Sequence, residues 1–527
     1  MSININLLED IKQNSLHPLL DRLHSKGKYL IDGETVKLKG EYFEKQTRIA
    51  LKNYDIINPE KIEEYIAFDG YFSLAKVLLE NDKAKTCEEI KKSNLRGRGG
   101  AGFPTGSKWE AAMKQNSDQK YIICNADEGD PGAYMDRSIL EGDPHSVLEG
   151  MAIAGFVTGA DKGFIYVRAE YPKAVATLIT AIHQAEEKNL LGHNILGSSF
   201  NFTIELRLGA GAFVCGEGTA LMESIEGKRG MPRNKEFRTT VKGLWGKPTV
   251  INNVETYANI AQIIQKGADW FKSIGTEKSS GTKVFALVGK ISNPGLVEVP
   301  MGTKIKDIVY DIGGGIPNGK NAKAVQTGGP SGGCIPVELF DTGVDFESLE
   351  KIGSIMGSGG MVVMDQDDCM VDIARFFLEF SVDESCGKCT PCRIGNKRLL
   401  ELLEKFVSGK AENQDIKKLE DLSHMVCSTS LCGLGQSSPN PILSTLQYFR
   451  QEYIDHAINK TCSSKACKSL LKYNITDKCV GCTKCTKVCP VKCISGSVRK
   501  KHTIDVIQCI KCGQCFETCP VDAIELV

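Results

Sequence analysis

Two copies of one cysteine pattern, C-x2-C-x2-C-x3-C-P, lie between residues 476 and 527. Three thiolates on one tight loop can hold three irons of a 4Fe-4S cluster, and the fourth cysteine of each run ligates the other cluster. Zinc sites close with four ligands and do not use two interleaved sets of this spacing. The pattern therefore predicts two 4Fe-4S clusters, one held by Cys479, Cys482, Cys485 and Cys519 and the other by Cys489, Cys509, Cys512 and Cys515.

A third set of cysteines lies upstream of this tail. Cys386, Cys389 and Cys392 repeat the C-x2-C-x2-C spacing, and Cys432 follows forty positions after Cys392. Three cysteines on one loop with one remote cysteine are again typical of a 4Fe-4S cluster. Cys427 is the alternative fourth ligand, so the spacing by itself leaves two choices.

His456, Cys462 and Cys467 lie outside the three cysteine motifs. With Cys334, from the segment GGPSGGCIP, they would complete a tetrahedral zinc site of one histidine and three cysteines. Unligated thiols and a helix-capping histidine explain these residues equally well, because loose spacing is a weak metal signal. We interpret Cys493 as a bystander to the tail ligands, and four further cysteines as buried apolar side chains: Cys87, Cys124, Cys215 and Cys369.

The segment GRGGAGFPTGSKW, from Gly97 to Trp109, places five glycines and one lysine in a single predicted loop. Glycines let main-chain amides approach a phosphate group closely, and Lys108 supplies a positive charge. The loop is neither a Walker loop nor a dinucleotide-binding GxGxxG after a strand. It indicates a phosphate-bearing cofactor, which only further motifs can specify.

Three more motifs follow this loop: CNADEGDPGAYMDR from residue 124, GAGAFVCGEGTALMESIEG from residue 209 and GLWGKPTVINNVET from residue 243. Together the four resemble the FMN- and NADH-binding subunit of respiratory complex I and its soluble relatives in hydrogenases and formate dehydrogenases. The resemblance runs from about residue 90 to about residue 455. It favours Cys432 over Cys427 as a cluster ligand. Residues 476–527 resemble the bacterial two-cluster ferredoxin domain.

The resemblance implies an FMN site and an adjoining NAD(P)H site. Main-chain amides and Lys108 suit the FMN phosphate, and Phe103 matches an aromatic residue on which the family stacks adenine. Because a hydride passes directly between nicotinamide and flavin, no protein acid or base is expected to be catalytic. The residues carried over as cofactor-binding are Gly97, Arg98, Gly99, Gly100, Phe103, Lys108, Asn125, Asp127, Glu128, Asp130, Phe213, Gly216, Glu217, Gly218, Lys235, Arg238, Asn252 and Asn253.

The nucleotide pocket departs from the family pattern in ways that favour NADP(H). The family reads GEETAL where this chain has GEGTAL, so Gly218 replaces a glutamate near the adenosine ribose. Arg238 follows Phe237 where the family has prolines and a phenylalanine, and Ala111 stands where the family has a second stacking phenylalanine. Losing a carboxylate and gaining a guanidinium favours a 2′-phosphate over a free ribose.

The glycine-dense texture between short apolar runs such as KYIICNA and GFIYVRA predicts an α/β domain with loops at its strand ends. Apolar residues at three- and four-residue spacing predict helices in NKRLLELLEKFV and ILSTLQYFRQEYIDHAI. The predicted organisation is an N-terminal helical extension (1–80), an α/β domain for FMN and NAD(P)H (81–280), a small β-grasp-like α+β module (281–370), a helical 4Fe-4S domain (371–460), a basic linker (461–475) and a ferredoxin-like α+β domain (476–527).

Composition limits the partners and the compartment. The chain has 527 residues, with 65 basic and 65 acidic side chains, so no net field points to nucleic acid or an anionic membrane. No apolar run is long enough to cross a bilayer, and MSININLLEDIKQ carries acids where a signal peptide needs basic and apolar residues. We expect a cytoplasmic protein without direct membrane insertion, whose cysteines serve as metal ligands rather than disulfides.

These features predict the flavin subunit of a multi-subunit oxidoreductase. It would exchange a hydride between FMN and NAD(P)(H), with NADP(H) favoured, and pass single electrons through three 4Fe-4S clusters to ferredoxin and a hydrogenase, as in electron-bifurcating complexes. A formate dehydrogenase diaphorase and a nonenzymatic relay are the alternatives. The expected partners are a thioredoxin-like 2Fe-2S subunit, an iron-sulfur hydrogenase or other catalytic subunit, and free ferredoxin. Between Lys460 and Lys501 the chain has eleven basic residues and one acid, Asp477. This positive charge either compensates the anionic clusters or forms a docking face for an acidic redox partner.

Overall fold

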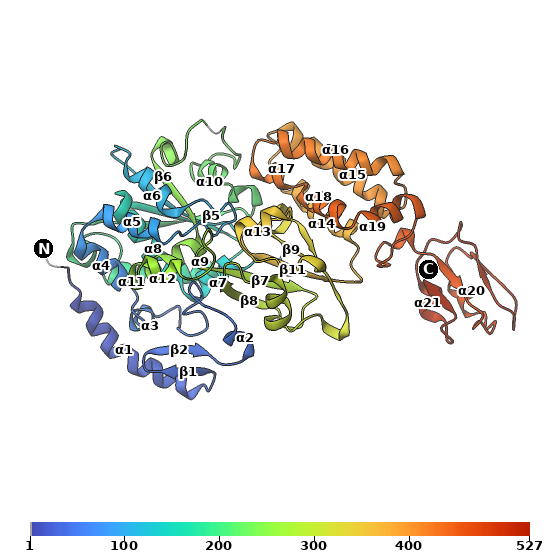
Figure 1. Cartoon of the computed structure of the whole chain (residues 1–527), viewed down its shortest axis with the longest axis horizontal. Helices are drawn as coiled ribbons and strands as arrows, with labels where there is room; N and C mark the ends of the chain where they lie inside the picture. Colours follow the sequence, from blue (N-terminus) through green and yellow to red (C-terminus); the bar gives the residue numbers. More distant parts are fainter. Residues whose placement is uncertain (1–2, 235, 527) are drawn as a thin grey trace.

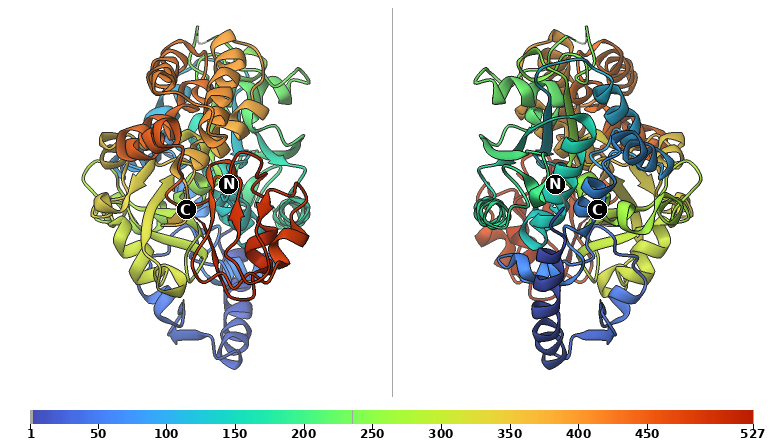
Figure 2. Two further views of the ribbon diagram at one scale, coloured as in Figure 1. Left: turned by 90° about the vertical axis from the view of Figure 1, so that its right-hand side faces the viewer. Right: turned by 90° about the vertical axis from the view of Figure 1, so that its left-hand side faces the viewer.

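The computed structural model describes residues 3–234 and 236–526. Figure 1 shows an elongated body with the carboxy-terminal tail as a separate lobe at the end opposite the N-terminus. The end-on views show α1 (Asn6–Ser25) extending from one edge of the body (Figure 2). Within the described ranges no helix combines the length and the apolar character needed to cross a membrane.

A four-stranded parallel sheet in the order β5-β4-β3-β6 forms the centre of the α/β domain. Its inner strands are almost continuously buried because helices cover both faces: α8 and α11 pack on one, and α10 on the other. Strands β4 and β6 flank β3 on opposite sides, so the carboxyl ends of β3 and β6 border the crevice where such sheets bind ligands. The elements are α6 (Thr105–Met113), β3 (Tyr121–Ala126), α7 (Met135–Gly142), α8 (Pro144–Thr158), β4 (Lys162–Arg168), α9 (Pro172–Glu187), β5 (Thr203–Gly209), α10 (Gly218–Ile225), β6 (Thr249–Asn253), α11 (Val254–Lys266) and α12 (Ala268–Lys272).

The N-terminal segment shares the core of the α/β domain. Leu8, Leu19 and Leu23 are buried in the same apolar cluster as α8 and α11. The segment is not purely helical, because β1 and β2 form an antiparallel hairpin whose turn contains Gly33 at a φ of 56°. Its elements after α1 are β1 (Tyr29–Asp32), β2 (Thr35–Leu38), α2 (Glu41–Glu44), α3 (Ile62–Ala67), α4 (Phe72–Glu80) and α5 (Lys83–Lys92).

The small α+β module has its own sheet and core. The sheet order is β10-β9-β11-β7-β8, in which β11 and β7 pair in parallel and the other neighbours are antiparallel. Phe285, Val297 and Ile308 belong to its separate apolar cluster. The elements are β7 (Thr282–Gly289), β8 (Gly295–Pro300), η4 (Asp307–Ile312), β9 (Ala322–Thr327), β10 (Cys334–Pro336), α13 (Phe346–Lys351) and β11 (Gly360–Asp365).

A helical domain follows, and its core includes residues of the linker to the tail. Leu399, Leu403 and Phe406 face the core at helical spacing. Cys462 and Cys467 belong to the same cluster, so the chain folds back on the helices before the tail begins. The helices are α14 (Met370–Asp383), α15 (Asn396–Val407), α16 (Asn413–Thr429), α17 (Gly433–Ser437), α18 (Asn440–Tyr448), α19 (Arg450–Ile454) and η9 (Asp455–Asn459).

The tail lobe is built from two short antiparallel strand pairs and two short helices. β12 pairs with β15, and β13 pairs with β14. Its apolar cluster consists largely of cysteines, with Tyr473, Ile475 and Ile524. Its elements are β12 (Tyr473–Ile475), α20 (Lys484–Val488), β13 (Ile494–Ser495), β14 (Thr503–Ile504), α21 (Gln514–Thr518) and β15 (Ile524–Leu526).

Candidate flavin and iron-sulfur sites

The carboxyl ends of β3 and β6 bring the predicted flavin residues together. Asn125 and Asn253 are register partners on these parallel strands, and Asp127 follows β3 directly. Asn125 Nδ2 donates to the Gly216 carbonyl at 2.8 Å, and Asn125 Oδ1 accepts from the Asp127 N–H at 3.1 Å. The loop after β3 and the turn before α10 are therefore fixed against each other.

Several buried polar atoms at this edge have no hydrogen-bond partner within the described part of the chain. Buried polar groups are normally hydrogen-bonded, so such a concentration indicates a polar ligand. The set mixes donors and acceptors, as the ribityl hydroxyls and the polar edge of an isoalloxazine require. These residues therefore fit FMN. The atoms are both carboxylate oxygens of Asp127, Asp136 Oδ1, Arg168 Nη1, Asn252 Nδ2 and Asn253 Oδ1.

Lys108 reaches the same edge from α6. Its Nζ donates to the Ile251 carbonyl at 2.6 Å and to Asn252 Oδ1 at 3.2 Å, and lies 5.9 Å from the ring centroid of Phe103. Burial lowers the pKa of Lys108 to about 8. No carboxylate forms an ion pair with it within residues 3–234 and 236–526. A partly desolvated ammonium without a carboxylate suits a phosphate group.

Burial raises the pKa of each acid in the loop after β3. The pKa is raised to about 7 for Asp127 and Glu128, and to about 6 for Asp130. Glu128 accepts from two main-chain N–H groups at the start of α7, and Asp130 accepts from the Ser358 hydroxyl at 2.6 Å. Arg168 lies 3.8 Å from Asp127 and opposes the rise of its pKa. At neutral pH the loop thus carries less than its formal negative charge, which reduces repulsion of an anionic cofactor.

The glycine loop is held tightly between the sheet and the α+β module. A Cβ on Gly99 would lie 3.1 Å from Asn253 Cβ, and Gly100 has a φ of 111° and approaches Gly357. The Arg98 side chain is fully buried and donates to three main-chain carbonyls, those of Arg96, Ser280 and Thr282. Its guanidinium therefore fastens the loop to the module, whereas the sequence predicted contact with the cofactor.

The residues expected to contact nucleotide lie on the outer side of the site. Gly97 N–H donates to the Phe103 carbonyl at 2.9 Å, and the Phe103 ring is 44% exposed, as a stacking platform must be. Gly218 is the first residue of α10, and the Glu217 carboxylate caps this helix by accepting from main-chain N–H groups. Arg238 is exposed in the loop after α10. Lys235 lies outside the described residues.

Four of the predicted cluster ligands line one small cavity beside the flavin loops: Cys386, Cys389, Cys392 and Cys432. Val214 and Pro232 form part of the same wall, and the neighbouring Phe213 N–H donates to Glu384 Oε2 at 2.8 Å. Asn396 Nδ2 lies 3.5 Å from Cys392 Sγ. Cys427, on α16, is not part of this lining. The geometry thus favours Cys432 and places its cavity directly against the turn that contains Gly216.

The tail contains two further cysteine-lined cavities, and each takes its fourth cysteine from the other run. One is lined by Cys479, Cys482, Cys485 and Cys519, and the other by Cys489, Cys509, Cys512 and Cys515. The structure thus brings together both sets that the spacing predicted. Cys493 also lines the second cavity, with its Sγ 3.5 Å from Cys489 Sγ, so it lies closer to the ligands than a bystander needs to.

Comparison with known families agrees with the order of these sites. The Nuo51 FMN-binding domain matches residues 90–262, and the SLBB domain matches residues 284–335. The iron-sulfur binding region of NADH-ubiquinone oxidoreductase-F matches residues 372–456. A 4Fe-4S dicluster domain matches residues 478–524.

Relatives match over most of the chain. The NADP-reducing hydrogenase subunit HndC of Solidesulfovibrio fructosivorans is 58% identical over 459 residues, which is 87% of this chain and 93% of that protein. NADH-quinone oxidoreductase-F of Aquifex aeolicus is 42% identical over 78% of this chain and 95% of its own length. This chain belongs to the NADH-quinone oxidoreductase-F family. A chain of the NAD+-reducing [NiFe]-hydrogenase, solved in the H2-reduced state, aligns with a TM-score of 0.69 and 34% identity over 78% of this chain and 67% of that chain.

Membership of the NADH-quinone oxidoreductase-F family confirms the predicted resemblance and an NAD(P)H-dependent flavin oxidoreductase subunit with FMN-binding and 4Fe-4S domains. Family membership does not explain a further cluster of three cysteines and one histidine, which lies where the linker before the tail packs on the helical domain. This member of the family gathers Cys369, His456, Cys462 and Cys467 there, and all four are buried. Their ligand atoms lie within 4.8 Å of one another.

The structure does not bring Cys334, the predicted fourth member, into this cluster. Its Sγ contacts Gln326 Oε1 at 2.8 Å inside the small sheet, and the cluster takes Cys369 instead. Cys369 precedes α14, with its Sγ 3.5 Å from His456 Nε2 and 3.6 Å from Cys467 Sγ. The interpretation of Cys369 as a plain buried side chain was therefore incomplete, because helix packing brings it next to residues that follow it by about ninety positions.

Sequence reasoning also missed residues that complete the flavin edge. Arg168 ends β4, the strand next to β3, so its place at a strand end was a usable signal. Asp136 lies inside the CNADEGDPGAYMDR motif and accepts from Asn253 Nδ2. Glu255 and Lys283 form a fully buried ion pair between α11 and β7. Only the packing of the α+β module on the flavin domain reveals that pair.

Proposed function

We propose that this chain is the flavin subunit of a multi-subunit, NAD(P)-linked hydrogenase that also uses ferredoxin in an electron-bifurcating reaction. The observation that carries the proposal is the wall shared by the flavin edge and the first cysteine cavity. Val214 lines that cavity, and Gly216, two residues later, accepts from Asn125 at the flavin edge. An electron that leaves the flavin at this edge therefore has a four-cysteine site directly next to it.

When bound, FMN supplies a hydride acceptor that can release electrons one at a time. The residues of the chain bind the cofactor and orient it. Asn125, Asn252 and Asn253 offer amide groups, and Lys108 offers a cation at the same edge. The three cysteine sets hold three 4Fe-4S clusters, which predicts about twelve irons per chain.

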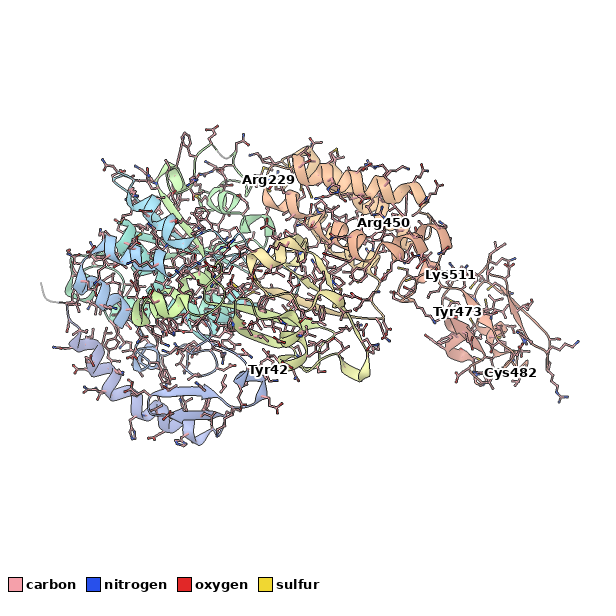
Figure 3. The ribbon with its side chains drawn as sticks, viewed as in Figure 1. Tyr42, Arg229, Arg450, Tyr473, Cys482 and Lys511 are labelled. Carbon is pink, nitrogen blue, oxygen red and sulfur yellow. The ribbon has the colours of Figure 1, made fainter. Side chains whose placement is uncertain are left out.

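The two tail cavities differ in their distance from the body. Tyr473 lines the cavity of Cys489, Cys509, Cys512 and Cys515, and Lys511 donates to the Ser469 carbonyl in the linker. Figure 3 shows Tyr473 and Lys511 on the side of the lobe that faces the body and Cys482 on the far side. We propose that the inner cluster receives electrons first and that the Cys482 cluster exchanges them with ferredoxin or a partner subunit. The partners we propose are an iron-sulfur hydrogenase and a thioredoxin-like 2Fe-2S subunit.

Anaerobic reduction of the purified flavoprotein tests the central proposal. NADH or NADPH is mixed with the oxidised protein, and flavin and cluster absorbance are followed separately. Rapid bleaching of both supports the proposed subunit. Fast reduction by neither nucleotide would leave only a nonenzymatic relay. Copurification with a formate dehydrogenase instead of a hydrogenase would overturn the assignment of the partner.

We propose that the nucleotide is NADP(H). The support is Gly218 in place of a ribose-binding glutamate, the exposed Arg238 nearby in sequence, and the name NADP-reducing hydrogenase of the relative HndC. Gly218→Glu should favour NADH by at least tenfold in relative kcat/KM, since a carboxylate repels a 2′-phosphate. Gly218→Ala is the matched control for space, because a Cβ there meets only Ile251 Cδ1, at 3.2 Å. Fast reduction of the unmodified protein by NADH alone would refute the assignment.

We propose that Cys369, His456, Cys462 and Cys467 bind one structural zinc ion. Three thiolates and one imidazole are a common zinc set, and three thiolates packed this closely would repel one another without a cation between them. The site ties the linker before the tail to the start of α14. Metal analysis should find one zinc in the unmodified protein and none in Cys369→Ser, with iron unchanged. Cys334→Ser should keep the zinc, and loss of zinc in that control would contradict the assignment.

A further inference from the structure

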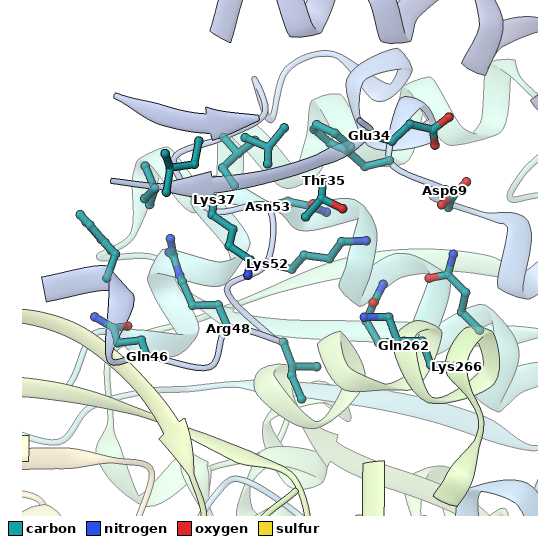
Figure 4. Close-up of a pocket in the computed structure, with 18 of the residues that line it drawn as sticks. Glu34, Thr35, Lys37, Gln46, Arg48, Lys52, Asn53, Asp69, Gln262 and Lys266 are labelled. Atoms are coloured by element: carbon teal, nitrogen blue, oxygen red, sulfur yellow. The ribbon is translucent and has the colours of Figure 1, made fainter. Parts of the chain in front are cut away.

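A cavity on the N-terminal side of the described chain has no part in the flavin or cluster sites. It encloses about 650 Å³ between the N-terminal hairpin and the ends of α11 and α12, and none of its lining residues belongs to a predicted cofactor site. Figure 4 shows side chains of the hairpin, the segment around Arg48 and α11 pointing into it. The volume is typical of a small-molecule site.

Four cations line this cavity without forming an ion pair in the described residues: Lys37, Arg48, Lys52 and Lys266. Two of its acids share one lysine from outside the lining, because Lys12 binds both Glu34 at 2.9 Å and Asp69 at 2.8 Å, so only one of these two negative charges is compensated. The third acid, Glu44, is exposed on the rim. The cavity therefore has an excess of uncompensated positive charge.

Arg48 is the most informative of these cations. Its Nε and Nη1 atoms are buried and have no hydrogen-bond partner among the described residues. Its guanidinium lies near the rings of Phe43 and Tyr54, 5.7 and 5.9 Å from their centroids. Burial lowers the pKa of Arg48, and the carboxylate of Glu298 opposes this. However, the two carboxylate oxygens of Glu298 accept hydrogen bonds from the main-chain N–H groups of Ala50 and Leu51, rather than from Arg48.

Lys52 and Lys266, which come from segments far apart in the sequence, both line the cavity. Burial lowers the pKa of Lys52, and the positive charge of Lys266 lowers it further. Burial also lowers the pKa of Lys266, whose Nζ lies 4.5 Å from the ring centroid of Trp270. Two ammonium groups that disfavour each other and a guanidinium with two unpartnered nitrogens suit a multiply charged anion, because such an anion would satisfy all three.

We propose that this cavity binds an organic phosphate with at least two negative charges. Arg48 offers a planar pair of donors suited to a phosphate, and Lys52 and Lys266 offer point charges in the same cavity. Gln262 and Trp270 line the cavity and give the organic part amide and aromatic contacts. Helix α11 begins next to the flavin residue Asn253 and ends at Lys266, so its thirteen residues separate the two sites by about 20 Å.

Calorimetric titration of the full, flavin-loaded chain tests the proposal with three probes: inorganic pyrophosphate, ADP and citrate. We expect saturable binding of pyrophosphate and ADP, with citrate weaker. Arg48→Gln/Lys52→Gln should weaken pyrophosphate binding at least tenfold. The matched control, Arg398→Gln/Lys417→Gln, removes the same charges from exposed positions of α15 and α16 and should bind as the unmodified protein does.

Lys266→Gln provides a second variant, at a lysine that stays partly exposed at the end of α11 and outside the apolar core. It should weaken pyrophosphate binding while the flavin absorbance stays unchanged. ADP and pyrophosphate can also enter the nucleotide pocket, so only binding that the cavity variants weaken counts as support. Equal binding by the cavity variants and the control, or no binding by the unmodified protein at millimolar probe, would overturn the proposal. Citrate binding more tightly than pyrophosphate would overturn the assignment to phosphate.

Discussion

The pH dependence of FMN binding tests the role of Lys108. Its pKa lies at about 8 because the ammonium is removed from water and has no carboxylate to offset that burial. A bound phosphate dianion favours the charged form and should return the pKa toward the ordinary lysine value of about 10.4. FMN binding then takes up one proton between these two pH values.

The magnitude follows from the two pKa values. Below about pH 8, Lys108 is protonated with and without FMN, so its titration does not affect affinity. Above that pH the free protein loses the charge while the complex keeps it, and the affinity falls toward tenfold per pH unit. The dissociation constant should rise about 20-fold between about pH 7.5 and about pH 9.5, which corresponds to about 2 kcal/mol. The FMN phosphate stays a dianion throughout, because its second pKa is about 6.

Quenching of FMN fluorescence by the flavin-free protein measures this slope. Lys108→Met should bind more weakly at neutral pH and show almost no pH dependence over the same range. Lys108→Arg should bind FMN with a flat profile, since a guanidinium stays charged. The same slope in the unmodified protein and in Lys108→Met would refute the reasoning, because the titration of Lys108 would then contribute nothing to the pH dependence.

Two further predictions concern the cluster beside the flavin and the contact between domains. Cys432→Ser should lower the iron content from about twelve to about eight atoms per chain, whereas Cys427→Ser should retain about twelve, as measured by metal analysis. Glu255→Gln should destabilise the protein by about 3–5 kcal/mol in urea unfolding, because Lys283 stays charged in the interior without its partner. The glutamine carbonyl can still accept the Val284 N–H that Glu255 accepts at 2.9 Å.

Each of these predictions has an internal control. Equal iron loss in both cysteine variants would show that the α16 thiol is also a ligand and contradict the cavity geometry. The double variant Glu255→Gln/Lys283→Met removes both charges and should recover most of the lost stability. If Glu255→Gln alone unfolds as the unmodified protein does, the buried pair does not hold the flavin domain to the α+β module.

Local spacing determined the cysteine chemistry. A C-x2-C-x2-C loop places three sulfurs around one cluster regardless of the rest of the fold, and the structure gathers the cysteines of each predicted set around one cavity. The polar residues after β3 and β6 were also predictable. They sit in motifs at the ends of apolar runs, and parallel strands bring their carboxyl ends to one edge.

Contacts between distant segments were decided only by the tertiary structure. Cys369 rather than Cys334 joins His456, because the start of α14 packs against the chain after α19, and sequence spacing carries no information about that packing. Arg98 turns inward for the same reason, since two of the carbonyls it binds, those of Ser280 and Thr282, lie where the α+β module begins.

The cationic cavity is the clearest example of a feature that the sequence does not reveal and the tertiary structure does. Its residues come from the hairpin, the segment around Arg48 and the end of α11, and each alone resembles an ordinary surface lysine or arginine. The sequence by itself determined the kinds of cofactor this protein holds, because ligand type and short-range spacing are local properties. The packing of distant segments determines which charged groups are removed from water and left without a partner. Only the tertiary structure therefore decides this.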